Sequence, residues 1–304
     1  MMVSSRYRNG KGVMRAVLVL GVLGLAASFG GALHPVGDSL AVFRGQIAVV
    51  VVLLAMIVWG LGARRSGALG AIIAIGCGLT VWPSLVMPAF AKPSDTSETG
   101  ILVYQKNMSF RMPDTKALTD DIRAAGVTHI TLQEVDPDNR AILAALKSEF
   151  PSQHLCGEKR GVGGMAVLSR WPRTKAEPIC NWGFVAMQVQ GPDTPVWIAS
   201  VHLNWPYPHN QARQVSLLLP ILKALDQPVV IGGDFNMVPY ASSSRRIRRA
   251  AGVQAMPGLH DSFPRFGRFL PLAIDHVWAS KVTAVEVRPL LGSDHMGLLA
   301  RIEG

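Results

Sequence analysis

The chain reads GGDFN at residues 232–236, directly after the apolar run 228–231, and GSDH at residues 292–295, after the apolar run 285–291. Residues two apart in an extended segment lie on the same face, so Asp234 and Asn236 can hold one phosphate or orient one water together. The second segment places a carboxylate beside an imidazole, which titrates near neutral pH. Together they indicate metal-assisted hydrolysis of a phosphoester.

Other strand-like runs also end in polar side chains. Asn107 follows the run 101–106, Glu134 lies near the end of 128–135, and His202 follows 197–201. A strand is also predicted at 274–280, with Asp275 near its start. Taken singly, such an Asn or Glu is more often a solvated edge residue, and such a His is as often a core or surface histidine. The complete, ordered set favours a site.

This succession of polar positions resembles the endonuclease/exonuclease/phosphatase superfamily, which has the DNase I-like fold. It is similar in particular to the bacterial branch that carries transmembrane helices before that domain, and the likeness covers about residues 100–303. The resemblance implies an α/β fold, a four-layer αββα sandwich of two packed sheets flanked by helices. One departure concerns Gln105 and Lys106, which precede Asn107 where small or aromatic residues are common in the family.

The chemistry of these residues gives each an expected role. We expect Mg²⁺, which Mn²⁺ can replace, because the candidate ligands are all oxygen donors: Glu134, Asn107 and Asp294. The candidate catalytic residues comprise a general base, the carboxylate that orients it, a donor to the leaving group or phosphate, and a pair that positions nucleophile and phosphate: His295, Asp275, His202, Asp234 and Asn236. Asn236 also counts as substrate-binding, with Arg245 as a weak second candidate, although a solvated helix face explains Arg245 more simply.

The substrate class stays open at this point. A nuclease-like phosphodiesterase or phosphomonoesterase is the first interpretation, because nucleic acid is a common substrate in the family. A lipid head-group phosphodiesterase of sphingomyelinase type, or a phosphoinositide phosphatase, is the alternative that a membrane tether favours. A non-catalytic binding module is disfavoured because no expected site residue has been replaced.

Three N-terminal segments lack Asp, Glu, Lys and Arg: 16–33, 45–63 and 66–91. Each is near or above the roughly 18 residues that cross a bilayer. They predict three transmembrane helices, although a buried helix or a cleaved signal peptide (for the first) would look similar. The predicted organisation is a membrane region at 1–91, a linker at 92–100 and the catalytic domain at 101–304.

The cations around these segments predict orientation. Four precede the first segment and two lie between the second and third, whereas only Arg44 lies between the first and second. The positive-inside rule then predicts a multi-pass inner-membrane protein with a periplasmic catalytic domain. Seven of 30 Lys and Arg but one of 20 acidic residues precede residue 92, so the remainder carries only about +4 of the net +10. This modest charge is weak evidence for nucleic acid.

Helices are predicted at about 114–125, 137–150, 209–225 and 242–251 from apolar spacing and from Gly126, a helix-stop residue. Cys156 and Cys180 lie in the catalytic domain and can pair in an oxidising compartment, but their separation leaves the pairing open.

Overall fold

The computed structural model describes residues 2–81, 100–157, 163–226, 228–267 and 272–303. The chain divides into two compact units, Met1–Val86 with Tyr240–Ser242, and Met87–Pro239 with Ser243–Gly304. Most of the predicted linker at 92–100 and the end of the third apolar segment lie outside the described residues.

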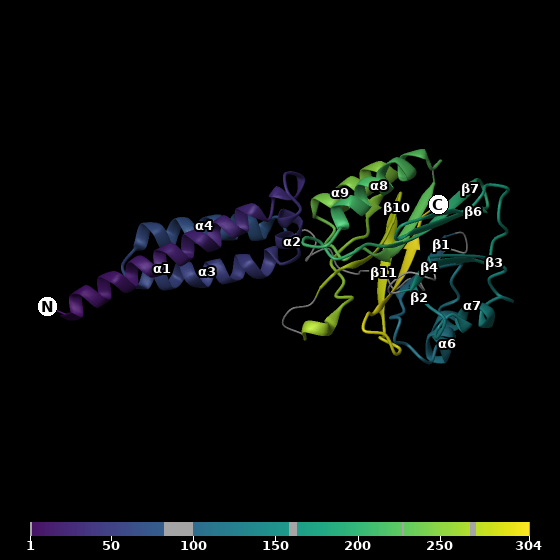
Figure 1. Ribbon diagram of the computed structural model, residues 1–304, viewed down its shortest axis with the longest axis horizontal. Helices are drawn as coiled ribbons and strands as arrows, with labels where there is room; N and C mark the ends of the chain where they lie inside the picture. The colour runs from purple at the N-terminus through teal and green to yellow at the C-terminus, as the bar shows by residue number, and fades with distance from the viewer. Residues whose placement is uncertain (1, 82–99, 158–162, 227, 268–271, 304) are drawn as a thin grey trace. The chain divides into compact units, whose positions relative to one another are not determined.

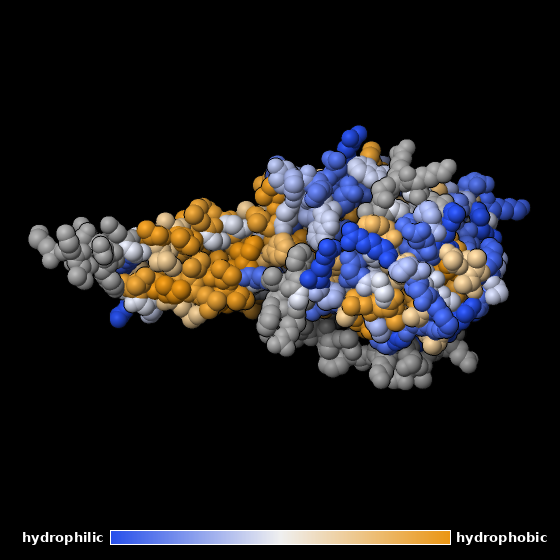
Figure 2. Space-filling model, turned by 60° about the horizontal axis from the view of Figure 1, so that its bottom comes forward, coloured by the Kyte–Doolittle hydropathy of each residue, from blue (hydrophilic) through white to orange (hydrophobic). Residues whose placement is uncertain are grey.

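The first unit consists of helices, whose bounds are α1 Met2–Ala27, η1 Gly30–Ala32, α2 Val36–Val42, α3 Arg44–Gly60 and α4 Arg64–Leu79. Helices α1, α3 and α4 pack through a small apolar core that includes Leu18, Leu25 and Val51. Many other apolar side chains of these helices are exposed, among them Leu20 and Ile72, and orange side chains cover the face of this unit shown in Figure 2. Such exposure is unusual for a helix that meets only water.

The prediction of three membrane-crossing helices is not confirmed. Among the described residues one helix is long and apolar enough, at Gly10–Ala27, or two if the bent pair α2 and α3 forms one span. The second apolar segment gives α3, which has 17 residues and is preceded by a bend of 76° between α2 and α3. The third gives α4, which has 16 residues, before the chain passes outside the described part.

The second unit contains two mixed six-stranded sheets. The first has the order β11 Val282–Arg288, β12 Gly297–Ile302, β1 Ile101–Asn107, β2 His129–Val135, β4 Gly164–Ser169, β3 Ser152–Cys156. The second has the order β5 Ile179–Asn181, β6 Phe184–Gln190, β7 Pro195–His202, β8 Val229–Asp234, β10 Asp275–Ala279, β9 Gln254–Ala255. Each sheet has one parallel pair, β1 with β2 and β7 with β8, and its other pairs are antiparallel.

The sheets pack face to face because alternate side chains on their strands are apolar. Val103 and Val167 of the first sheet share a buried core with Val185 and Val230 of the second. Helices α6 Lys116–Ala125 and α7 Ala141–Ala145 cover the outer face of the first sheet, and α8 Gln211–Ala224 and α9 Ser242–Ala251 lie on the side of the second (Figure 1). This arrangement of helices on two mixed sheets confirms the α/β, DNase I-like prediction.

The predicted helix at 137–150 is much shorter in the structure, where α7 has only five residues. Asp136 and Asn139 account for its late start, because their side chains form hydrogen bonds with nearby backbone in place of a helix. Asp136 Oδ1 accepts from the Asn139 backbone N–H at 3.2 Å, and Asn139 Oδ1 accepts from the Asp136 N–H at 2.9 Å. The prediction that Gly126 ends a helix is confirmed, since α6 ends there with φ at 62°.

A disulfide joins Cys156 at the end of β3 to Cys180 in β5, with the two Cα atoms 5.7 Å apart. These strands are edge strands of the two different sheets. The bridge therefore cross-links the sheets and resolves the pairing that the sequence left open.

Candidate active site

The two parallel strand pairs bring their carboxyl ends to one edge of the sandwich. Asn107 ends β1 and Glu134 lies one residue before the end of β2, while His202 ends β7 directly opposite Asp234 at the end of β8. Because parallel strands run the same way, polar residues that follow each apolar run must meet at this edge. Asp275 begins β10 and lies opposite Asp234 in the antiparallel register.

Asn107 is fully buried and lies between two carboxylates. Its amide nitrogen donates to Glu134 Oε1 at 3.0 Å and to Asp234 Oδ2 at 3.1 Å. Its oxygen accepts the Ser109 backbone N–H at 2.9 Å, which fixes the orientation of the amide. In this orientation both amide hydrogens of Asn107 are directed at carboxylates of the site and its oxygen at the Ser109 backbone, so its role is to hold Glu134 and Asp234 rather than to ligate a metal.

Glu134 adopts a left-handed backbone, with φ at 58°, that is uncommon outside glycine. Asn139 supports this conformation, since its amide nitrogen donates to the Glu134 carbonyl at 2.8 Å. The Glu134 carboxylate accepts the Phe110 N–H at 2.8 Å. Burial raises the pKa of Glu134, and the bonds from Phe110 and Asn107 only partly oppose it.

Asp234 and Asn236 form the second part of the site. Asn236 also has a left-handed backbone, with φ at 47°, and its N–H donates to Asp234 Oδ1 at 2.8 Å. Its amide nitrogen donates to the Leu203 carbonyl at 2.7 Å, whereas its buried Oδ1 has no partner within the described part of the chain. Burial and the charge of Asp275 raise the pKa of Asp234 to about 8. The site thus contains a free buried acceptor and a carboxyl group that ionises less readily than an exposed one.

His295 and Asp275 form a buried pair, in which His295 Nδ1 lies 2.8 Å from Asp275 Oδ2. The other oxygen of Asp275 accepts from Gln105 Nε2 at 3.0 Å. His295 Nε2 faces the carboxylate of Asp234, 3.7 Å from Oδ2. Burial lowers the pKa of His295, but the charges of Asp275 and Asp234 outweigh burial and raise it to about 9.

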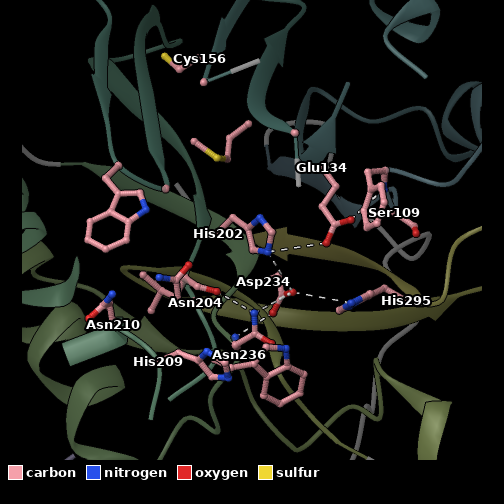
Figure 3. Close-up of a pocket in the computed structure, with 18 of the residues that line it drawn as sticks. Ser109, Glu134, Cys156, His202, Asn204, His209, Asn210, Asp234, Asn236 and His295 are labelled. Atoms are coloured by element: carbon pink, nitrogen blue, oxygen red, sulfur yellow. Dashed lines mark hydrogen bonds and ion pairs between the residues drawn. The ribbon is translucent and has the colours of Figure 1, made fainter. Parts of the chain in front are cut away.

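His202 lies on the opposite side of the same carboxylates (Figure 3). Its Nε2 is 3.8 Å from both Glu134 Oε1 and Asp234 Oδ2. Burial lowers the pKa of His202 to about 4, so that its ring is neutral at pH 7. A neutral imidazole that donates through Nε2 can serve as a hydrogen-bond donor to a phosphate or leaving oxygen.

One cleft of about 1460 Å³ is lined by Glu134, His202, Asp234, Asn236 and His295, whereas Asn107 and Asp275 are fully buried and do not line it. Figure 3 shows Glu134, His202, Asp234 and His295 pointing toward one another in it. Exposed aromatic and cationic side chains also line the cleft: Trp182, Trp205, Arg111, Arg213 and Arg265. The cleft can therefore receive a group larger than the phosphate itself, and one with negative charge or a flat face.

Two predicted residues lie apart from this centre. Asp294 lines the cleft, but its side chain is 42% exposed and lies 3.6 Å from Arg265 Nη1. Arg245 is exposed on α9 and does not line the cleft, because the buried side of that helix is formed by residues such as Ile247. The structure therefore gives no support for Arg245 in substrate binding.

Sequence reasoning missed residues that support the site through hydrogen bonds to its side chains or backbone: Gln105, Lys106, Asn139, Ser262 and Ser293. A signal was present for the first two, because a polar pair within the β1 run departs from the family pattern.

A family model for the Endonuclease/Exonuclease/phosphatase family matches residues 105–295, and the chain belongs to this family, whose members hydrolyse phosphoester bonds. Among curated proteins, no sequence matches the chain.

Several solved structures share the fold. D. rerio TDP2 complexed with a single-strand DNA product is 14% identical, with a TM-score of 0.54, and covers 68% of this chain and 100% of its own. An endonuclease/exonuclease/phosphatase family protein from Leptotrichia buccalis is 15% identical, with a TM-score of 0.52, and covers 67% and 100%. A mutant beta toxin from Staphylococcus aureus with bound magnesium ions is 13% identical, with a TM-score of 0.50, and also covers 67% and 100%.

Proposed function

We propose that the chain is a divalent-metal-dependent phosphodiesterase whose general base is His295. The observation that carries this proposal is the partner of each ring nitrogen of His295. Its Nδ1 donates to buried Asp275, and its Nε2 is directed at the carboxylate of Asp234. A base in this setting can take a proton from a water that attacks a phosphate bound beside Glu134 and Asp234.

The donor set suits Mg²⁺ or Mn²⁺. Glu134 supplies a carboxylate oxygen at the cleft, and Asp294 supplies another at its rim. Arg265, which lies beside Asp294, would have to move away for Asp294 to bind the ion. Asp275 belongs to a buried group with Asp234 and His295 that has metal-like spacing, but it is fully buried and does not line the cleft, whereas Glu134 does. Glu134 is therefore the better primary ligand, and a bound cation would neutralise charge on the phosphoryl oxygens.

The protein's own residues account for the remaining chemistry. Water attacks phosphorus, its proton passes to His295 Nε2, and the bond from phosphorus to the leaving oxygen breaks. Asp275 holds the ring and stabilises its protonated form. Asn236 Oδ1, which has no partner within the described residues, can accept a hydrogen from the attacking water. His202 donates a hydrogen bond to a phosphoryl or leaving oxygen, while Asn107 holds the carboxylates of Glu134 and Asp234 in place.

The substrate class that we favour is a nucleic-acid phosphodiester. In support, arginines and two exposed tryptophans line the cleft, and together they can bind phosphates and stack against a base. The alternative is a lipid head-group phosphodiester, which the exposed apolar side chains of α1, α3 and α4 favour. A membrane association through α1 is compatible with either substrate.

A substrate panel tests this proposal. The full-length protein in detergent is incubated with Mg²⁺ and, in parallel, with single-stranded DNA, RNA, sphingomyelin and phosphoinositide vesicles. The proposal predicts the fastest turnover on nucleic acid. Faster turnover on one of the lipids would support the alternative, and no hydrolysis of any of them would contradict a phosphodiesterase.

A further inference from the structure

Lys106 is a fully buried cation in β1, one residue before Asn107. Asn107 and Gln105 point to the inner side of the sheet, where they meet Asp234 and Asp275. Side chains alternate along a strand, so Lys106 points to the other side. Its ammonium therefore takes no direct part among the carboxylates of the cleft.

All three ammonium hydrogens of Lys106 have backbone acceptors. Nζ donates to the carbonyls of Pro289, Leu290 and His295 at 3.2, 2.8 and 2.6 Å. No carboxylate of the described residues lies within ion-pair distance of it. Burial lowers the pKa of Lys106 to about 8, against the raising charges of Asp275, Asp121 and Asp294, so the ammonium remains the major form at pH 7.

The acceptors of Lys106 lie on both sides of an unfavourable turn. Leu291 has φ at 50° and Gly292 at 93°, two successive left-handed residues in the loop that leads to His295. A non-glycine residue in this conformation persists only where its surroundings hold it. Ser293 supplies a second attachment, since its hydroxyl donates to the Asn107 carbonyl at 2.7 Å and accepts the His295 N–H at 3.0 Å.

We propose that Lys106 is a positioning residue, whose ammonium holds the backbone of residues 289–295 in the conformation that directs His295 between Asp275 and Asp234. This role rests on the proposed function of His295 as general base. Without the ammonium, the loop can leave its left-handed turn and the His295 ring loses its place against Asp275. Displacement of a catalytic group by about 1 Å can reduce turnover by about 10²-fold.

The test compares Lys106→Met with Lys116→Met in the full-length protein. Methionine keeps the length of the side chain but cannot donate, and Lys116 is an exposed lysine on α6. With bis(4-nitrophenyl) phosphate and Mg²⁺, we expect Lys106→Met to lower kcat by about 10- to 100-fold with KM within about threefold. We also expect hydrogen–deuterium exchange to rise at least about tenfold in segment 289–297 alone. The control should change neither quantity.

Unchanged exchange in this segment together with kcat within about twofold of wild type would overturn the proposal, as would exchange that rises equally throughout the catalytic unit. If Lys106→Met does not fold, Lys106→Gln replaces it, because its amide can still donate two hydrogen bonds. Its kcat should then lie between those of wild type and an inactive protein, and a wild-type kcat and exchange pattern would overturn the role. If the wild-type protein hydrolyses nothing, the proposed function is refuted. The exchange measurement would still test whether Lys106 holds the backbone of this segment.

Discussion

His295 and Asp275 are joined by a buried hydrogen bond of 2.8 Å between Nδ1 and Oδ2. A carboxylate can only accept in this bond, so in the neutral ring the proton lies on Nδ1 and the lone pair on Nε2. That lone pair faces the cleft, where Nε2 lies 3.7 Å from Asp234 Oδ2. The pair thereby determines which ring atom can act as a base.

The first prediction concerns pH. Burial lowers the pKa of His295, but the charges of Asp275 and Asp234 outweigh it and raise the pKa to about 9. A general base works in its neutral form, so kcat should fall as pH decreases through this pKa. Asp275→Asn removes one raising charge, and the acid limb should therefore move to lower pH while the maximal rate falls by at least about 10²-fold. The measurement is kcat against pH for both proteins. An identical profile would disprove that Asp275 raises the pKa of a catalytic His295.

The second prediction concerns the floor of the cleft. Glu134→Ala, Asp234→Ala and His295→Ala should each lower turnover by at least about 10²-fold, because each removes charge stabilisation or proton transfer. Lys281→Ala is a suitable control, because this exposed lysine pairs with Glu303 just before the start of β11. Steady-state kinetics on folded variants supply the comparison. Near-normal turnover in His295→Ala would remove that residue from its assigned role.

The third prediction concerns the disulfide. Cys156 and Cys180 are 24 residues apart, and closing a loop of this length in the unfolded chain stabilises the fold by about 3 kcal/mol. A Cys156→Ser, Cys180→Ser double variant should lose about this much free energy of unfolding. Cys77→Ser, which removes the free cysteine, should leave the catalytic unit unaffected. Urea unfolding followed by tryptophan fluorescence gives the values, and equal midpoints for all three proteins would show that the bridge contributes nothing.

The fourth prediction concerns topology. With α1 as a span and its preceding cations inside, the catalytic unit should lie outside the cytoplasm, where a disulfide can form. A periplasm-active reporter fused after the C-terminus should then be active, and a cytoplasm-active one should not. The reverse result would place the enzyme in the cytoplasm.

Much of the catalytic unit could be predicted from the sequence, because apolar runs that end in polar residues predict both the strands and the edge at which they meet. The candidate residues Glu134, His202, Asp234 and His295 do line one cleft, while their individual roles stay predictions. The roles of the supporting residues could not be predicted, although Lys106 departs from the family pattern, because Lys106 and Asn139 act through backbone carbonyls that are distant in sequence or depend on a local turn.

The helical region was less predictable for a different physical reason. Composition alone marks apolar segments, but it does not show where a helix ends or bends. The second segment gives only the 17 residues of α3, and the chain bends by 76° between α2 and α3, just before that segment. Similarly, the sequence placed Arg245 on the helix predicted at 242–251 but could not show that this residue lies away from the cleft.

The most direct test of the central claim is the rate of phosphodiester hydrolysis before and after removal of divalent ions. The full-length protein is treated with EDTA, dialysed, and assayed with bis(4-nitrophenyl) phosphate as Mg²⁺ or Mn²⁺ is added back, with Glu134→Gln as the matched variant. We predict that EDTA abolishes hydrolysis, that either ion restores it, and that Glu134→Gln needs at least about tenfold more of the ion because it loses a charged oxygen ligand. Full activity in EDTA would contradict the metal-dependent mechanism.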